Sequence, residues 1–228
     1  MRFALDAEQR QFAASIDAAL ADADLPAAVR AWNKGDAGAA RAVWTRLADL
    51  GITALGVAEE FGGVGAHPVD LVVAVERLGR WCVPGPVVES IAVAPLLLAG
   101  DDRSAALAAG DLITTVAMPP MVPLALDAEF AGLTLLAGDG VVAAAAPSAG
   151  HPSVDPARQL FQVRAVGDQW RADTDRAFDF GALATTAQLL GAGQAMLEMS
   201  VDHAKQRTQF GRPIGGYQAI KHKLADVH

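Results

Sequence analysis

The chain has 228 residues, of which 52% are hydrophobic and 19% charged, and its formal net charge is −8. This length can bury a sizeable core, and the apolar excess predicts either extensive burial or a covered subunit surface. The acidic balance argues against nucleic-acid binding, which needs clustered lysine and arginine. The single cysteine, Cys82, excludes an internal disulfide framework and a cysteine-rich metal site, and we expect it to be a buried apolar filler.

The N-terminal sequence MRFALDAEQRQ turns polar almost at once, so it does not have the pattern of a signal peptide. The longest apolar run, residues 91–99, contains Pro95 and is too short to cross a bilayer. We therefore expect a soluble, cytoplasmic protein with no membrane partner.

Residues 1–110 are predicted to form an N-terminal helical domain. Apolar residues recur at helical spacing and predict helices over 38–49, 69–81 and 91–98. The stretch 50–65 contains five glycines and is typical of a loop between helices. A first apolar helical face is formed by Phe12, Ile16, Ala19 and Leu20.

Residues 111–176 are predicted to form a short β middle domain with a mainly antiparallel sheet. Short β-prone runs are separated here by proline, glycine and aspartate at short intervals. The runs cover residues 112–116, 133–136, 141–146 and 161–166.

Residues 177–228 are predicted to begin a C-terminal helical domain. A long helix is expected over 182–206, with Leu190, Leu197, Val201 and Ala204 on one stripe. A last helix starts near Tyr217, and its apolar face through Ile220, Leu224 and Val227 needs a partner. The sequence stops within that apolar pattern, so we expect an incomplete bundle. The predicted fold class is α+β, mainly α.

The segment Arg207–Gly211 carries the strongest chemical signal. Arg207 can bind phosphate oxygens with two hydrogen bonds, Thr208 and Gln209 add donors, and Phe210 offers an aromatic face. Gly211 allows a sharp turn or a close approach to a ligand. The helix that follows begins near Gln218, where backbone N–H groups favour an anion. A dinucleotide pyrophosphate would suit this set, although a plain helix–turn–helix with a solvated arginine has the same pattern.

Several motifs in the same order resemble the acyl-CoA dehydrogenase family. Residues 207–214, R-T-Q-F-G-R-P-I, followed by Tyr217-Gln218 and L-A-D at 224–226, are similar to the family signature R-x-Q-F-G-x-x-I … F/Y-Q … L-A-D/E. Residues 50–65 resemble its L-G … P-E-E-Y-G-G-x-G loop, with Ala58 where proline is usual. Residues 76–80, E-R-L-G-R, and 153–158, S-V-D-P-A-R, resemble two further family stretches.

The resemblance implies a helical domain, a β domain and a helical bundle, with FAD as cofactor and an acyl-CoA thioester as substrate. In the family, the R-x-Q-F-G segment of one subunit reaches the FAD held mainly by its neighbour. Carried over, Arg207 and Gln209 bind the pyrophosphate, Phe210 packs near the adenosine part, and Gly211 and Gln218 belong to the same cofactor-binding set. The implied reaction is α,β-desaturation, in which a carboxylate removes the α-proton and a hydride leaves to the flavin.

Two departures from the family pattern concern the active site. The segment T-E-P-x-A-G-S-D, whose strands cover the flavin ring, is represented only by A-M-P-P at 117–120. The catalytic glutamate of most members lies downstream of the last residue here. Its minority position, at the start of the long helix, falls near Ala182, where residues 181–184 hold no carboxylate. No catalytic residue is therefore assigned to this chain.

Other carboxylates are weaker candidates for a base. Asp175 and Asp179 lie just upstream of Ala182, but helix-entry aspartates are the plainer interpretation. Glu198 and Asp202, spaced by four residues, are interpreted as a solvated or interface pair. Glu59 and Glu60 belong to the glycine-rich loop and are interpreted as structural.

These departures resemble the degenerate short subunit of heteromeric acyl-CoA dehydrogenases of the sterol side-chain type. There the partner subunit supplies the base and most of the flavin pocket. We therefore expect a heterotetramer, with a homo-oligomer as the alternative. A non-catalytic structural or regulatory subunit that has lost FAD is the other function considered. No metal is expected, because His203, His222 and His228 join no further ligands, although His222 could lie near the FAD phosphates.

Overall fold

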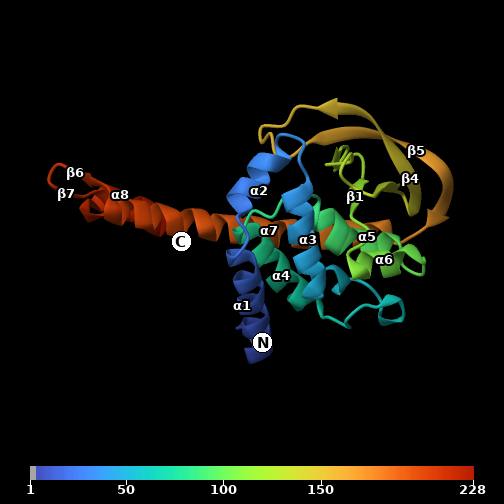
Figure 1. The fold of residues 1–228 in the computed structure, drawn as a ribbon, viewed down its shortest axis with the longest axis horizontal. Helices are drawn as coiled ribbons and strands as arrows, with labels where there is room; N and C mark the ends of the chain where they lie inside the picture. The colour runs from blue at the N-terminus through green and yellow to red at the C-terminus, as the bar shows by residue number, and fades with distance from the viewer. Residues whose placement is uncertain (1–3) are drawn as a thin grey trace.

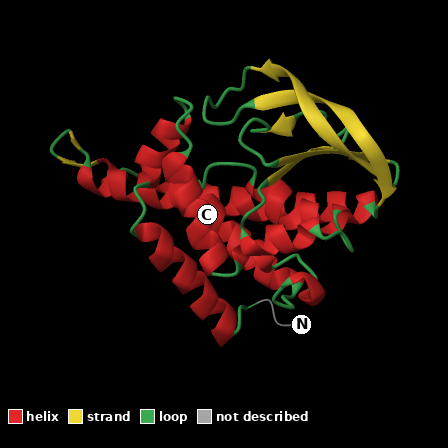
Figure 2. Ribbon diagram, turned by 45° about the vertical axis from the view of Figure 1, so that its right-hand side comes forward, coloured by secondary structure: helices red, strands yellow, loops and turns green. Residues whose placement is uncertain are grey.

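The computed structural model describes residues 4–228, which form helices, one curved five-stranded sheet and a small hairpin (Figures 1 and 2). The helices are α1 (Ala7–Ala21), α2 (Leu25–Trp32), α3 (Gly38–Asp49), α4 (Pro68–Arg80), α5 (Ala94–Leu97), α6 (Arg103–Ala109), α7 (Thr174–Gln206) and α8 (Gln218–Val227). Short helical turns are η1 (Ile52–Ala54), η2 (Glu59–Phe61), the π-helical η3 (Glu89–Val93) and η4 (Ile214–Gly216). The strands are β1 (Thr114–Ala117), β2 (Ala125–Leu126), β3 (Leu133–Gly138), β4 (Val141–His151), β5 (Leu160–Arg171), β6 (Thr208–Gln209) and β7 (Arg212–Pro213).

The first helices begin where short polar side chains can bond the free N–H groups. Asp6 accepts from Gln9 N at 2.8 Å, and the Gln9 side chain accepts in return from Asp6 N, which makes a capping box at the start of α1. Asp24 caps α2 by accepting from Ala27 N at 3.0 Å. Helices α3 and α4 match the predicted bounds to within one residue. The apolar pattern did not predict α2 and α6, which have eight and seven residues.

The predicted helix over 91–98 differs from the structure at its start. The chain is already wound at Glu89, in the π-helical turn η3, and continues as α5. A π-turn inserts one extra residue into a helical turn, and such turns are frequent at functional sites. Glu89 is therefore placed on the same helical segment as the buried Ile91.

The main core is an apolar cluster that the helical layer shares with the sheet, and two smaller clusters lie beside it. Ile16, Leu47, Leu78 and Ile91 come from α1, α3, α4 and η3 and are fully buried, and Leu135 of β3 joins them. Complete burial of a leucine or isoleucine side chain stabilises the fold by about 1.5–3 kcal/mol. The sheet and the helices therefore hold each other in place.

The sheet has the strand order β1-β3-β4-β5-β2 and curls over the helical layer (Figure 2, yellow). Its long hairpin pairs Val141 with Arg171 at one end and His151 with Leu160 at the other. The pairs are antiparallel except β1 with β3, which run parallel. The mainly α, α+β class is thus confirmed. The parallel β1–β3 pair makes the sheet mixed, which was not predicted because hydrophobic patterns do not specify strand direction.

The end of the sheet is fastened to α5 by Trp170. Its indole N–H donates to Leu97 O at 2.8 Å, and the Arg103 guanidinium lies 4.7 Å from the ring centroid. Asp101 accepts two hydrogen bonds from the Arg103 guanidinium, at 2.8 and 2.6 Å, and one from Arg103 N at 2.9 Å, and these hold the pKa of the aspartate below its usual range. This contact ties the end of β5 to α5 and α6.

Helix α7 begins at Thr174, eight residues before the predicted start at Ala182. Asp173 caps it by accepting from Arg176 N at 3.0 Å. The charged residues at 175, 176 and 179 interrupt the apolar stripe, which is why the pattern placed the start too late. The helix passes under the sheet, packs along α4 and then projects from the body of the molecule (Figure 1).

Helices α4 and α7 touch at two glycines. A Cβ atom on Gly191 would lie 1.8 Å from Glu76 O, and one on Gly79 would lie 2.1 Å from Gln188 O. Both values are far below any real contact, so only hydrogen fits at these positions. Beyond this crossing, Arg80 Nη2 bonds Glu198 Oε2 at 2.6 Å and keeps the pKa of Glu198 low, at about 2.

Two further expectations about side chains are tested by the structure. Cys82 is exposed, not buried: it follows the C-cap of α4 in a left-handed turn (φ 50°), which carries its side chain outward. Ile220 and Leu224 of α8 are half-buried in a groove shared with α7, so this helix folds back on α7. Val227 is 71% exposed.

Candidate functional site

The segment after α7 forms a tight hairpin, which we call the arm (residues 207–218). Thr208 pairs with Pro213 and Gln209 with Arg212, and the two turn residues, Phe210 and Gly211, both have positive φ (51° and 77°). This is the geometry of a two-residue type I′ turn, in which glycine is favoured and phenylalanine is strained. Strain of this kind, roughly 1–3 kcal/mol, persists only when the surrounding structure enforces it.

Contacts inside the arm hold the turn. Ile214 N donates to Arg207 O at 2.8 Å, and the Tyr217 hydroxyl donates to Gln209 O at 3.1 Å. The Arg212 guanidinium lies 4.0 Å from the centroid of the Tyr217 ring. The arm is therefore a preformed structure and not an open loop.

The five residues predicted to bind a cofactor are all in the arm and all exposed, with Phe210 92% exposed at the tip. Within residues 4–228, the side chains of Arg207 and Gln209 have no hydrogen-bond or ion-pair partner. Gln218 is the first residue of α8. The arm thus offers one cation, one amide and one aromatic face to whatever lies outside this part of the chain.

A second feature lies at the other end of α7, under the sheet. A cavity of about 330 Å³ is bounded by η3, by β1 and the loop after it, and by the second and third turns of α7. Met118 and Ala182 both line it. These are the residues at the predicted flavin-covering segment and at the minority position of the catalytic glutamate. The structure therefore brings the two predicted positions together.

The cavity contains a carboxyl group that the sequence motifs did not indicate. Glu89 lines it from η3, among Val88, Val93, Val116 and Phe178. Burial raises the pKa of the Glu89 carboxyl, an effect that its own backbone N–H and the charge of Arg158 only partly oppose. One acidic residue inside the apolar run 87–98 was the available signal.

The other candidate carboxylates do not reach this cavity. Asp175 and Asp179 are exposed on α7, and Asp175 lies in its first turn, as expected of a helix-entry residue. Glu198 pairs with Arg80, and Asp202 with Lys205 at 3.7 Å, so these two acids do not form a couple. The exposed Glu59 and Glu60 form part of η2 in the glycine-rich loop.

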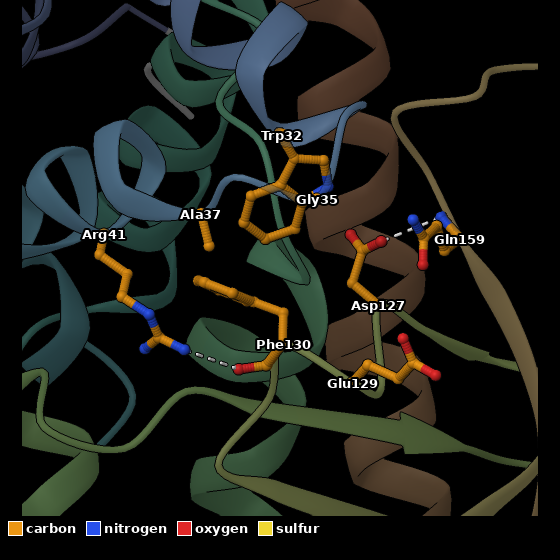
Figure 3. Close-up of a pocket in the computed structure, with 8 residues that line it drawn as sticks. All are labelled: Trp32, Gly35, Ala37, Arg41, Asp127, Glu129, Phe130 and Gln159. Carbon is orange, nitrogen blue, oxygen red and sulfur yellow. Dashed lines mark hydrogen bonds between the residues drawn. The ribbon is translucent and has the colours of Figure 1, made fainter.

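A third feature is a cavity of about 230 Å³ between α2, α3 and the loop after β2 (Figure 3). Asp127 is 3% exposed here; its Oδ1 accepts from Gln159 N at 2.9 Å, whereas Oδ2 makes no hydrogen bond of good geometry within residues 4–228. Burial raises the pKa of Asp127 to about 6, although Gln159 N and the nearby Trp32 indole favour the charged form. Phe130 packs edge-on against Trp32 and under Arg41.

Substitution of Asp127 by asparagine should change how stability depends on pH. Because the pKa of Asp127 is higher in the folded state, its stabilising contribution is complete below about pH 4 and is lost as the pH rises through about 6. The variant lacks this loss, so its stability relative to wild type should rise between pH 4 and 7, by on the order of 1–3 kcal/mol. Thermal unfolding across this range measures the difference. Glu129→Gln, an exposed change in the same cavity, is the control, and parallel curves for wild type and Asp127→Asn would contradict the expectation.

Two kinds of feature are absent from the described residues. Residues 4–228 hold no group of three or more histidine, cysteine, aspartate or glutamate side chains placed to bind a metal ion. In the same part of the chain, none of the helices has both the length and the apolar character needed to span a bilayer.

Comparison with known proteins gives matches along most of the chain. Residues 6–106 match the acyl-CoA dehydrogenase N-terminal domain, and residues 170–228 match the acyl-CoA dehydrogenase C-terminal domain. Acyl-CoA dehydrogenase IpdE2 from Mycolicibacterium smegmatis is 33% identical over 97% of this chain and 72% of its own length. IpdE2 from Mycobacterium tuberculosis is 32% identical over 89% of this chain, which spans 65% of that relative.

Solved structures show the same fold at lower identity. The ChsE4-ChsE5 complex from Mycobacterium tuberculosis has a chain that superposes with a TM-score of 0.79 at 22% identity, covering 99% of this chain and 74% of its own. A chain of the Tcur3481-Tcur3483 steroid ACAD, a G363A variant, has a TM-score of 0.79 at 20% identity, covering 96% and 72%. The arrangement of helical layer, small sheet and long helix is thus that of known chains.

Proposed function

The chain belongs to the acyl-CoA dehydrogenase family, and we propose that it works as one subunit of an FAD-dependent enzyme that desaturates acyl-CoA thioesters. The observation that carries this proposal is the arm: a preformed hairpin at the end of α7 with unpartnered donors directed away from its own chain. A second subunit would hold most of the flavin, and this chain would add the outer contacts to it.

The side chains of the arm fit the outer half of FAD. A guanidinium binds pyrophosphate oxygens with two charge-assisted hydrogen bonds, and Arg207 has all its donors free within residues 4–228. Gln209 adds an amide N–H beside it. Phe210 would pack on the adenosine part, which explains why an aromatic ring stands 92% exposed at a strained position. Gly211 completes the turn, and Gln218 lies at the N-terminus of α8, where an anion is favoured.

A partner chain is also supported by the surface of α7. Leu189, Leu190, Met196 and Met199 are each at least 63% exposed, along the stretch of α7 that runs from its crossing with α4 toward the projecting end. Four large apolar side chains in one stretch form a surface that proteins usually cover. A related dehydrogenase subunit is the proposed partner, and two described complexes of related fold, ChsE4-ChsE5 and Tcur3481-Tcur3483, pair two different chains.

The cavity under the sheet is the proposed place for part of the acyl group. FAD, when bound, accepts the hydride that leaves the β-carbon. The walls of this cavity are mainly apolar and would exclude water from the reacting carbons. Ala182 stands at the position where some family members carry the base, so we assign proton removal to a carboxylate of the partner. The proposed substrates are lipid or steroid acyl thioesters, because one similar structure is described as a steroid enzyme.

The absorption spectrum of the purified protein tests the proposal. Co-expression with an acyl-CoA dehydrogenase subunit encoded beside it should give a yellow complex that bleaches when a suitable acyl-CoA is added. The chain purified alone serves as the control and should hold much less flavin. A stable complex that carries no flavin would contradict the proposal and would favour the non-catalytic alternative.

A further inference from the structure

The carboxyl of Glu89 is set in surroundings that are otherwise apolar. The cavity around it is lined by valines from η3 and β1, by Met118 and by Phe178, and the Thr185 hydroxyl is the other side-chain polar group that lines it. Within residues 4–228 no side chain donates a hydrogen bond to Glu89. Glu89 is half-buried, and the part of its carboxyl that faces the cavity is left with hydrogen-bonding capacity that no side chain of residues 4–228 uses and that a ligand in the cavity could use.

The fold keeps Glu89 in this position by two means. The π-helical turn of η3 carries the residue, while Ser90 beside it accepts a hydrogen bond from Thr114 N at 3.1 Å and so ties η3 to β1. On the far side, Gly181 of α7 approaches Val93 so closely that an added Cβ would lie 2.9 Å from its methyl group. The cavity wall that holds the carboxyl is therefore packed on two sides.

A carboxylic acid in its protonated form donates one hydrogen bond and accepts others. The apolar walls disfavour the charged form of Glu89 and raise the pKa of its carboxyl, which favours the protonated acid. An apolar cavity with a single donor of this kind suits a ligand with a hydrocarbon skeleton and one oxygen atom. A plain hydrocarbon would leave the carboxyl without a partner, and a charged ligand would find no counter-ion among the lining residues.

We propose that Glu89 donates a hydrogen bond to a hydroxyl or carbonyl oxygen on the acyl group of the substrate, and that it selects oxygenated over plain acyl-CoA thioesters. This inference rests on the proposed function, since it takes the cavity as the acyl site. Glu89 acts here as a specificity residue and takes no part in the chemical step.

Binding of matched acyl-CoA esters to the subunit complex tests this selectivity. Octanoyl-CoA is compared with a series of octanoyl-CoA esters that carry one ketone or hydroxyl group at successive carbons, and dissociation constants are measured by calorimetry. Wild type should bind at least one oxygenated ester more tightly than the plain ester. Glu89→Leu should raise the dissociation constant of that ester by about tenfold to a hundredfold, and it should leave the dissociation constant of the plain ester unchanged or lower it.

Two further variants separate a lost hydrogen bond from a changed shape. Glu89→Gln retains an N–H donor and should keep most of the selectivity. Met118→Leu, a change of similar volume in the same cavity, should affect both kinds of ester equally. Thermal unfolding of each variant checks that the fold is intact. The inference would be overturned if Glu89→Leu weakened the binding of both esters equally. It would also be overturned if Glu89→Gln were as unselective as Glu89→Leu.

Turnover measured beside binding distinguishes this inference from the function on which it rests. A complex that binds the oxygenated ester selectively but never desaturates it supports the role of Glu89 and contradicts the proposed reaction. A complex that desaturates all esters with equal efficiency contradicts the inference alone. If Glu89→Gln lost turnover of both kinds of ester at full flavin content, Glu89 would be a catalytic residue and the inference would be wrong.

Discussion

Substitution of Arg207 by alanine is expected to remove most of the FAD from the assembled enzyme. The guanidinium is the one cation of the arm without a contact to another side chain in residues 4–228, because Arg212 stacks on Tyr217. Loss of a bidentate, charge-assisted contact to pyrophosphate costs about 1.5–3 kcal/mol. The dissociation constant for FAD should therefore rise by roughly tenfold to a hundredfold. Flavin absorbance per complex and titration of the apo-complex with FAD measure the effect.

Lys205→Ala is the matched control for Arg207→Ala. Lys205 lies two residues earlier, on α7, and makes only a surface pair with Asp202 at 3.7 Å, so its removal should leave the flavin content unchanged. Arg207→Lys keeps the charge but loses the planar fork, and an intermediate affinity is expected. If Arg207→Ala and Lys205→Ala retained flavin equally, the arm would not contact the cofactor, and the non-catalytic role would be the better account.

Substitution of Gly191 by alanine is expected to destabilise the fold more than any other single methyl group added to α7. The new Cβ would lie 1.8 Å from Glu76 O and 2.8 Å from Arg80 N, and both are backbone atoms of α4 that cannot rotate away. The two helices must separate, which loosens the packing that Ala187 and Leu78 share. We expect a loss of about 3 kcal/mol or more in the free energy of unfolding. Denaturant and thermal unfolding report it directly.

Gly193→Ala offers a control with identical chemistry two residues away. Nothing lies within 4 Å of a Cβ at Gly193, so the added methyl group meets open space. Alanine is the better helix former by about 1 kcal/mol, and this variant should be slightly more stable than wild type. If Gly191→Ala lowers the free energy of unfolding and Gly193→Ala raises it, the destabilisation is located at the helix crossing. Similar melting temperatures for both variants would disprove the close approach of α4 and α7.

The parts of the fold that could be predicted are those with a repeated pattern. Helices α3 and α4 and strand β3 follow apolar periods that can be recognised in a single chain, whereas the predicted runs 141–146 and 161–166 cover only about half of β4 and β5. Helix α6 has only seven residues, too few to establish a period. The first turns of α7 were missed because the charged residues at 175, 176 and 179 flank the buried Ala177 and interrupt the apolar pattern.

The candidate site also has one part that could be predicted from the sequence and one part that was not. The arm could be found because Arg207, Gln209 and Gly211 stand at fixed spacing in one short segment. Their role at FAD stays a prediction, since it concerns atoms outside this chain. Glu89 was not found, because the only signal was one acid in an apolar run, and its position in a cavity depends on η3, β1 and α7 meeting around it. A burial that depends on three distant segments is a property of tertiary structure.

The projecting end of α7 sets a limit on how the chain can change in length. After Glu198, the last residue of α7 joined by a side chain to α4, the helix continues for eight residues to Gln206 before the arm begins. Each residue of an α-helix advances the chain by about 1.5 Å and turns it by about 100°. Deleting one residue between 199 and 206 would therefore swing Arg207 and Phe210 a quarter-turn or more around the helix axis. This stretch can accept many substitutions on its exposed side, but insertions and deletions there would aim the arm in the wrong direction.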